Sequence, residues 1–307
     1  MRTISDFSAH SAKGLGGAAT PLPCRGGAGV GSVTLLRRAA MMLHVMMLTT
    51  MTAWAADITQ NTAVVINSSN KATYNNKSIT GTVPSSSSVD PFTSQEHFYS
   101  PGAIVVDGIE LNLTIDGFTA DYRGSYSPRS AISLAHGATL HLTVLGSNYL
   151  RGGYGGAGIA VPDGCTLEIT SASTGTLTAI GGADYGGGAG IGSISSGHNP
   201  NNINLCPQGC GDIIINGGTI NATGGTFSMR GTPTSGAAGI GSSEYSGSCI
   251  NTIPYTDATY VNNVTGNITI NGGIINATSG YMAAAIGGGL FGTVETIAIT
   301  GGQITTT

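Results

Sequence analysis

The sequence predicts an all-β protein: a single-stranded right-handed parallel β-helix, or β-solenoid, with an irregular N-terminal cap. Three observations predict it. Glycine supplies 50 of the 307 residues, short motifs recur about every 27 to 29 residues, and no segment between them has the periodicity of an amphipathic helix. Self-similarity of this kind is typical of stacked coils, whereas a β-sandwich does not require near-identical motifs at fixed spacing.

Residues 1–55 are predicted to be a leader that ends in a signal peptide. Arg37 and Arg38 precede a short, Met-rich apolar run, and Ala53–Ala55 follow it as an A-x-A site. These are the three parts of a secretory signal peptide, and the apolar run is too short to cross a membrane. The sequence therefore predicts a secreted or cell-surface protein without a transmembrane segment.

The rest of the chain divides into two parts. Residues 56–102 are polar and irregular, with a serine run at Ser85–Ser88 and one strand-like piece at Ala63–Asn67. We expect them to cap the first coil, because an open end exposes core and unpaired backbone. Residues 103–307 carry the repeats, and since the chain stops inside a repeat we expect this domain to be truncated at its C-terminus.

Two motifs alternate within the repeats. Ile213–Gly225 and Ile268–Gly280 are identical at ten of thirteen positions, and a third copy opens at Ile297. The second motif is a run of small residues around an isoleucine, as in Gly188–Gly192. One unit therefore reads as a β-branched strand, a Gly-Gly turn, a second strand, a variable loop and a small-residue strand.

Stacking such units places equivalent residues in columns about 4.8 Å apart. Alternation in each strand sends every second residue inward, so that His141, between two leucines, is expected to point outward. We expect an inner isoleucine column and two amide ladders: Ile215, Ile270 and Ile299; Asn216 with Asn271; Asn221 with Asn276.

The stretch from Leu140 to Ser193 resembles the glycine-rich repeats of large bacterial cell-surface proteins. It includes G-G-A-G-I-A-V-P-D-G and G-T-L-T-A-I-G-G, and the resemblance extends over about residues 103–307. Some members of that group are similar to a calcium-associated, carbohydrate-binding β-helix domain. The resemblance implies a bacterial, non-catalytic adhesin or binding protein whose partner is a polysaccharide or cell-surface glycan, although no ligand residue of the family maps onto this chain.

Tyrosines are the candidate carbohydrate-binding residues. Tyr154, Tyr185 and Tyr281 each precede a small-residue strand by five or six positions, so the solenoid would bring them to one edge. A row of aromatic rings suits a linear glycan, whose C–H faces pack on rings. The alternative is that these rings pack on one another or shield the coil edge.

Aspartates are the candidate metal ligands. Asp163, Asp184 and Asp212 lie near turns that also offer backbone carbonyl oxygens, the ligand type that calcium prefers. Their spacing matches no defined calcium loop. Calcium is therefore a candidate ligand, and no cofactor is predicted to be required.

Four cysteines follow the leader: Cys165, Cys206, Cys210 and Cys249. An even number in an exported chain predicts two disulfides. Four cysteines allow three pairings, and the sequence does not choose among them.

The net charge and the residue motifs argue against nucleic-acid binding and against catalysis. The formal net charge is −4 and no basic stripe is present, so no nucleic-acid partner is expected. A polysaccharide lyase would need clustered acids with an arginine or lysine, and the densest such group is Asp116, Asp121 and Arg123, which also fits a solvated loop pair. No catalytic residue is therefore assigned.

The repeats alone are compatible with two other functions. One is a structural stalk that only projects other domains. The other is ice binding through threonine-rich strands such as Ile304–Thr307, which the sequence disfavours because no long T-x-T array recurs along the chain.

Overall fold

The computed structural model describes residues 55–59, 63–83, 102–125, 129–183, 186–195, 209–229, 231–244, 264–290 and 292–307. The chain divides into two compact units, Met1–Thr52 and Ala53–Thr307, and all described residues lie in the second. In this described part the strands dominate, and the helical structure is one turn, α2 (Lys71–Tyr74).

Three parallel sheets form the walls of the second unit. Sheet A has eight strands, in spatial order β1 (Ala55–Asp57), β3 (Lys77–Thr80), β6 (Glu110–Asp116), β9 (Thr139–Leu145), β12 (Thr166–Ile169), β15 (Asp212–Ile215), β20 (Val264–Ile270) and β23 (Thr293–Ile299).

Sheets B and C have seven strands each. Sheet B runs β2 (Val64–Ile66), β5 (Ile104–Asp107), β8 (Ile132–Ala135), β11 (Ile159–Ala160), β14 (Ile191–Gly192), β19 (Ile240–Gly241) and β22 (Ile286–Gly287). Sheet C runs β4 (Thr82–Val83), β7 (Thr119–Asp121), β10 (Ser147–Arg151), β13 (Thr176–Ile180), β16 (Thr219–Thr223), β21 (Ile274–Thr278) and β24 (Gln303–Thr306).

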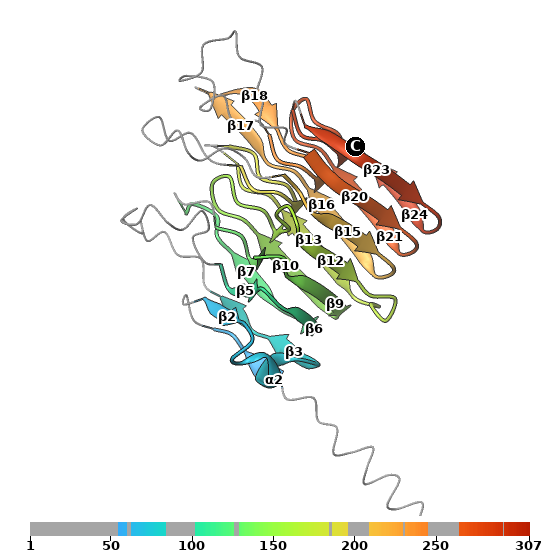
Figure 1. Cartoon of the computed structure of the whole chain (residues 1–307). Helices are drawn as coiled ribbons and strands as arrows, with labels where there is room; N and C mark the ends of the chain where they lie inside the picture. Colours follow the sequence, from blue (N-terminus) through green and yellow to red (C-terminus); the bar gives the residue numbers. More distant parts are fainter. Residues whose placement is uncertain are drawn as a thin grey trace, which may run out of the picture. The chain divides into compact units, whose positions relative to one another are not determined.

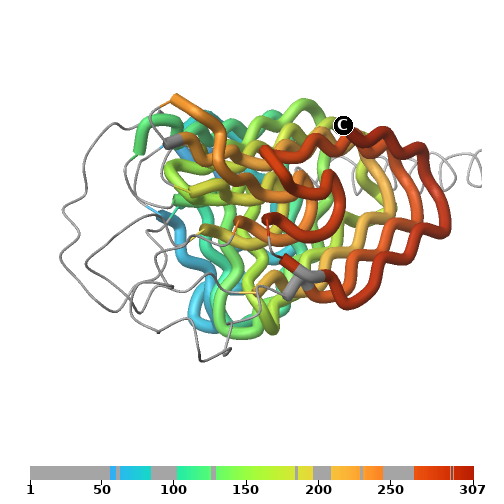
Figure 2. Tube along the Cα trace, turned by 90° about the horizontal axis from the view of Figure 1, so that it is seen from above, coloured from blue at the N-terminus to red at the C-terminus, as the bar shows by residue number. Residues whose placement is uncertain are grey.

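The prediction of a parallel β-solenoid is confirmed. In each sheet the spatial order of the strands is their order along the chain, and consecutive strands pair in parallel (Figure 1). Each complete coil contributes one strand to sheet A, one to sheet C and one to sheet B, in that sequence. Figure 2 shows the coils following one another from the N-terminal to the C-terminal end of this unit.

Alternation along the strands fills the space between the sheets. The inner residues of sheet A form columns, one of which pairs Leu142, Ile169, Ile215, Ile270 and Ile299 in register. The first four are fully buried, whereas Ile299 in the final coil is 54% exposed. Each inward residue is therefore buried because the next coil covers it.

Sheet B explains why the small-residue motif recurs. Its strands approach the other walls so closely that a Cβ atom on Gly190 would lie 2.6 Å from the carbonyl oxygen of Gly239 and 2.7 Å from the amide nitrogen of Thr223. The following residue, Ile191, supplies the one large side chain of this strand and is fully buried. Glycine is required here by close approach of backbones.

The coils begin upstream of the first clear repeat. Strands β1, β3, β2 and β4 lie within or at the edge of the segment expected to be an irregular cap, and they join all three sheets. The strand-like piece at Ala63–Asn67 is β2. Polar residues 56–83 thus build two short coils, and α2 follows β2.

One element departs from the repeat. An antiparallel hairpin, β17 (Thr226–Met229) with β18 (Thr232–Gly236), is inserted between β16 of sheet C and β19 of sheet B (Figure 1). It occupies the corner where short connections lead from β10 to β11 and from β21 to β22.

Candidate functional site

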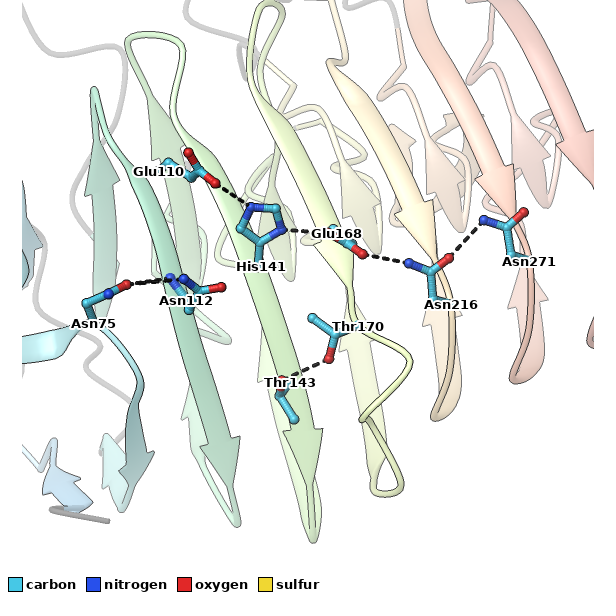
Figure 3. Close-up of polar contacts among 9 residues, drawn as sticks. All are labelled: Asn75, Glu110, Asn112, His141, Thr143, Glu168, Thr170, Asn216 and Asn271. Carbon is cyan, nitrogen blue, oxygen red and sulfur yellow. Dashed lines mark hydrogen bonds and ion pairs between the residues drawn. The ribbon is translucent and has the colours of Figure 1, made fainter. Parts of the chain in front are cut away.

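The outer face of sheet A carries a continuous chain of polar side chains (Figure 3). His141 lies between two carboxylates, with Nε2 3.1 Å from Glu110 Oε1 and Nδ1 2.5 Å from Glu168 Oε2. The other oxygen of Glu168 accepts a hydrogen bond from Asn216 Nδ2 at 2.7 Å. Asn271 Nδ2 donates in turn to Asn216 Oδ1 at 2.8 Å, so five neighbouring strands are linked.

Further bonds extend this pattern over the same face. Thr300 donates to Asn271 Oδ1 at 2.7 Å, and Thr143 and Thr170 share a 2.8 Å hydroxyl contact. At the N-terminal end, the backbone N–H of Asn112 donates to Asn75 Oδ1 at 2.9 Å. The polar groups in these contacts satisfy one another, which ties the coils in register. On the same face Thr114, Thr139 and Thr166 make no side-chain hydrogen bond within the described residues.

The charge on His141 is stabilised by its neighbours. Partial burial alone would lower the pKa of its imidazole, but the hydrogen bonds that the ring donates to Glu168 and Glu110, together with the charges of these carboxylates, outweigh burial and raise the pKa above its ordinary value. His141 points outward as expected from its alternation with leucines.

Sheet C presents a different outer face, which includes a tyrosine and three charged residues near its N-terminal end. Tyr149 on β10 lies in register between Thr119 on β7 and Thr178 on β13. Two residues further along the strands, Arg151 is in register with Asp121. All of these side chains are partly exposed.

Arg123 completes this group, which we name the Tyr149 cluster: Asp121, Arg123, Tyr149 and Arg151. Arg123 Nη2 lies 2.9 Å from Asp121 Oδ2 and donates a long bond, 3.5 Å, to the Tyr149 hydroxyl. The ion pair with Asp121 is the main reason that the pKa of Arg123 is raised. Arg151 Nε is buried and has no hydrogen-bond partner among the described residues.

The outer faces of sheets A and C differ in how many of their polar side chains form internal hydrogen bonds. On sheet C the structure gives Thr119, Thr176, Thr178 and Thr219 no side-chain hydrogen bond within the described residues. Their hydroxyls can therefore donate to and accept from a bound molecule without breaking internal bonds. The Tyr149 cluster, with its threonine neighbours, is the candidate functional site.

The predicted tyrosine row is only partly within the described chain. Tyr154 is partly buried between β10 and β11, and Tyr281 is 48% exposed between β21 and β22. Both follow a strand of sheet C, three coils apart, or about 14 Å at the usual strand spacing. Tyr185 lies outside the described residues, so the row stays a prediction.

The predicted calcium ligands are not brought together as a set. Asp163 is exposed in the turn before β12, while Asp212 on β15 accepts hydrogen bonds from the backbone and side-chain amides of Asn267 at 2.8 and 3.0 Å. Asp184 lies outside the described residues. Within the described ranges, no group of three or more His, Cys, Asp or Glu side chains is placed to hold a metal ion.

The acid and base group expected for a lyase is also divided. Asp121 and Arg123 are ion-paired, but Asp116 ends β6 on sheet A, whereas Asp121 ends β7 on sheet C. The structure thus leaves Asp121 and Arg123 as an ion pair at the surface, without Asp116.

The predicted disulfides are corrected at two of the four cysteines. Cys165 and Cys210 are buried free thiols, and burial raises the pKa of both. Each fills a place in the hydrophobic core, where a thiol behaves as a small apolar group. Cys206 and Cys249 lie outside the described residues.

Sequence reasoning missed the residues that matter most on both faces. Tyr149, Arg151, Glu110 and Glu168 lie in the strands but are not among the residues that the repeats share. The available signal was register: shifting the repeats onto one another by 29 or 30 residues puts Thr119, Tyr149 and Thr178 in one column.

Comparison with known proteins adds no relative: no family model, curated protein or solved structure matches this chain. Among the residues that the structure describes, no helix is long and apolar enough to span a membrane.

Proposed function

We propose that this chain is a non-catalytic polysaccharide-binding solenoid, secreted or displayed on a bacterial cell surface, where it acts in adhesion. The observation that carries the proposal is the Tyr149 cluster on an exposed parallel sheet. Export rests on the predicted signal peptide within residues 1–55, and the bacterial setting rests on the resemblance to surface repeats.

The chemistry of the cluster suits a sugar ring. A tyrosine ring offers an apolar face to the C–H groups of a sugar, while its hydroxyl bonds at the edge. Arg151 and Arg123 supply fixed N–H donors, and Asp121 supplies carboxylate acceptors. Thr119 and Thr178, one strand to either side of Tyr149, add hydroxyls that have no partner within the described chain.

The geometry of the sheet suits a chain of sugars. Neighbouring strands are about 4.8 Å apart, so the column through Thr119, Tyr149 and Thr178 extends about 10 Å. A linear glycan lying across the strands would meet one outward side chain per strand. The site is a shallow platform, which fits binding along a polymer rather than enclosure of a small molecule.

Binding by the wild-type chain and two Tyr→Ala variants tests the proposal. Soluble polysaccharides chosen from a glycan array, run with calcium and with EDTA, provide the probes. Tyr149→Ala should weaken binding about tenfold, or roughly 1.4 kcal/mol, because the ring is a central contact. Tyr281→Ala is the control, since it removes a more exposed tyrosine three coils away.

Each alternative predicts a different result. Equal loss in both variants would favour the predicted tyrosine row, and loss in Tyr281→Ala alone would refute the Tyr149 site. A wild-type chain that binds no glycan would favour a structural stalk, which the self-paired polar face of sheet A also suits. Cleavage of the polymer would favour a polysaccharide lyase.

A further inference from the structure

The C-terminal half of the outer face of sheet C is a grid without charged side chains. Strands β13, β16 and β21, together with the segment from β24 to the last residue, each contribute three outward positions in register. We name these twelve residues the hydroxyl grid: Thr176, Thr178, Ile180, Thr219, Asn221, Thr223, Ile274, Asn276, Thr278, Gln303, Thr305 and Thr307.

Strand geometry fixes the repeats of this grid. Neighbouring strands are about 4.8 Å apart, and outward residues of one strand are about 6.7 Å apart. These two distances are close to the oxygen spacings on a face of ice. Seven of the twelve positions are threonine, so stacking assembles in space the T-x-T array that does not recur along the chain.

Contacts between coils hold parts of the grid in fixed positions. Asn276 Nδ2 donates to Asn221 Oδ1 at 2.8 Å, and the hydroxyls of Thr278 and Thr307 lie 2.9 Å apart. On the inner side of the same strands, Ile220 and Ile275 are fully buried. A face anchored in this way can present its groups to an ordered lattice with little loss of side-chain entropy.

The chemistry of the grid favours ordered water over sugar. It has no charged group to organise its own hydration and no aromatic ring for a sugar to pack on. It combines hydroxyls with methyl groups. Ile274 is 45% exposed, although the residues in register with it on the two adjacent strands are polar. Methyl groups restrict the water beside them, while hydroxyls and amides bond to it.

We propose that the hydroxyl grid binds ice. The grid shares Thr176, Thr178 and Thr219 with the threonine neighbours of the Tyr149 cluster but contains none of the four cluster residues, and the proposal does not depend on polysaccharide binding. The lattice is recognised by regular spacing of hydroxyl and methyl groups on parallel strands that pair in register.

The test is adsorption of the fluorescently labelled full chain to a growing ice surface, together with inhibition of ice recrystallisation. Thr219→Tyr places a bulky ring on β16, one of the two inner strands of the grid. Thr269→Tyr is the matched control, because Thr269 is an outward threonine of sheet A on β20. Circular dichroism and thermal unfolding check that both variants fold.

Adsorption and growth inhibition by the wild type and Thr269→Tyr, with loss of both in Thr219→Tyr, would support the proposal. A wild-type chain that is excluded from ice would overturn it, as would a Thr219→Tyr variant that adsorbs like wild type. Tyr149→Ala should keep full ice adsorption, so failure of the polysaccharide proposal and failure of this one are distinguishable. Loss of retention on an insoluble polysaccharide in Thr219→Tyr, without ice binding by the wild type, would assign the grid to sugar instead.

Discussion

His141 joins two carboxylates that belong to different coils, Glu110 on β6 and Glu168 on β12. Because its pKa is raised in the folded chain, its contribution to stability is complete below the unfolded pKa of about 6.5 and is lost as pH rises through the higher folded value. We expect His141→Gln to cost about 0.5–1 kcal/mol near pH 5.5 and less near pH 9, as the site is partly exposed.

Urea unfolding of the two proteins at both pH values measures this difference. His136→Asn is the control, because His136 also contacts a carboxylate, Asp107, but its side chain is 83% exposed. Its effect should be smaller, and asparagine tolerates the positive φ of 51° found there. A His141→Gln cost that grows with rising pH would contradict the assignment.

The buried thiols give a second residue-scale prediction. Cys165 and Cys210 have raised pKa values and are almost fully buried, so the reactive thiolate is scarce and inaccessible. An alkylating reagent should modify them in the native chain far more slowly than in urea, as peptide mass spectrometry can show. Fast native labelling of either residue would refute this core placement, and recovery of a Cys165 or Cys210 peptide in a disulfide would refute the free thiol.

Sheet B depends on residues without side chains. At Gly190 an added Cβ would meet three backbone atoms at 2.6 to 2.9 Å, and none of them can move without shifting a neighbouring coil. We expect Gly190→Ala to cost about 3 kcal/mol or more, or to yield no soluble chain.

Gly164→Ala is the comparison for this element. Gly164 has a positive φ of 76° but nothing lies within 4 Å of an added Cβ, so the expected cost is about 1 kcal/mol from backbone strain alone. Denaturant unfolding separates the two effects. Equal costs would show that close packing of sheet B is not what excludes side chains.

The strands of sheets A and C were predictable because alternation and repeat spacing decide them. The ladders of Asn216 with Asn271 and of Asn221 with Asn276 form as expected, each with a 2.8 Å bond. The coils formed by β1–β4 were not predictable, since their residues do not share the repeat motif and are held by pairing to the next coil. The β17–β18 hairpin likewise replaces a loop without changing the period of the core.

At the scale of the whole repeat unit, the outer faces of sheets A and C have different roles. On sheet A the side chains from Glu110 through His141 to Asn271 hydrogen-bond to one another, and these bonds fix the stacking of the coils. Sheet C leaves the hydroxyls of Thr119, Thr176, Thr178 and Thr219 without a side-chain partner among the described residues. A long-range sequence pattern determines the fold, whereas the candidate site depends on which unrepeated residues that fold places side by side.

This division explains why the candidate site was harder to predict than the fold. Ile215 and Ile270 have equivalents in other repeats, so one motif places them all. Tyr149 and Arg151 have no repeated counterpart, and Arg123 follows its strand rather than lying in it. Their proximity appears only when the coils are in register.

The most direct test of the binding proposal is a methyl NMR titration of the threonine-labelled chain with an oligosaccharide of the glycan that it binds best. We predict that the methyl signals of Thr119 and Thr178, which flank Tyr149, shift in proportion to ligand, while those of Thr143 and Thr170 on sheet A do not. Shifts confined to sheet A, or none near Tyr149 at saturating ligand, would contradict the assignment of the binding site to sheet C.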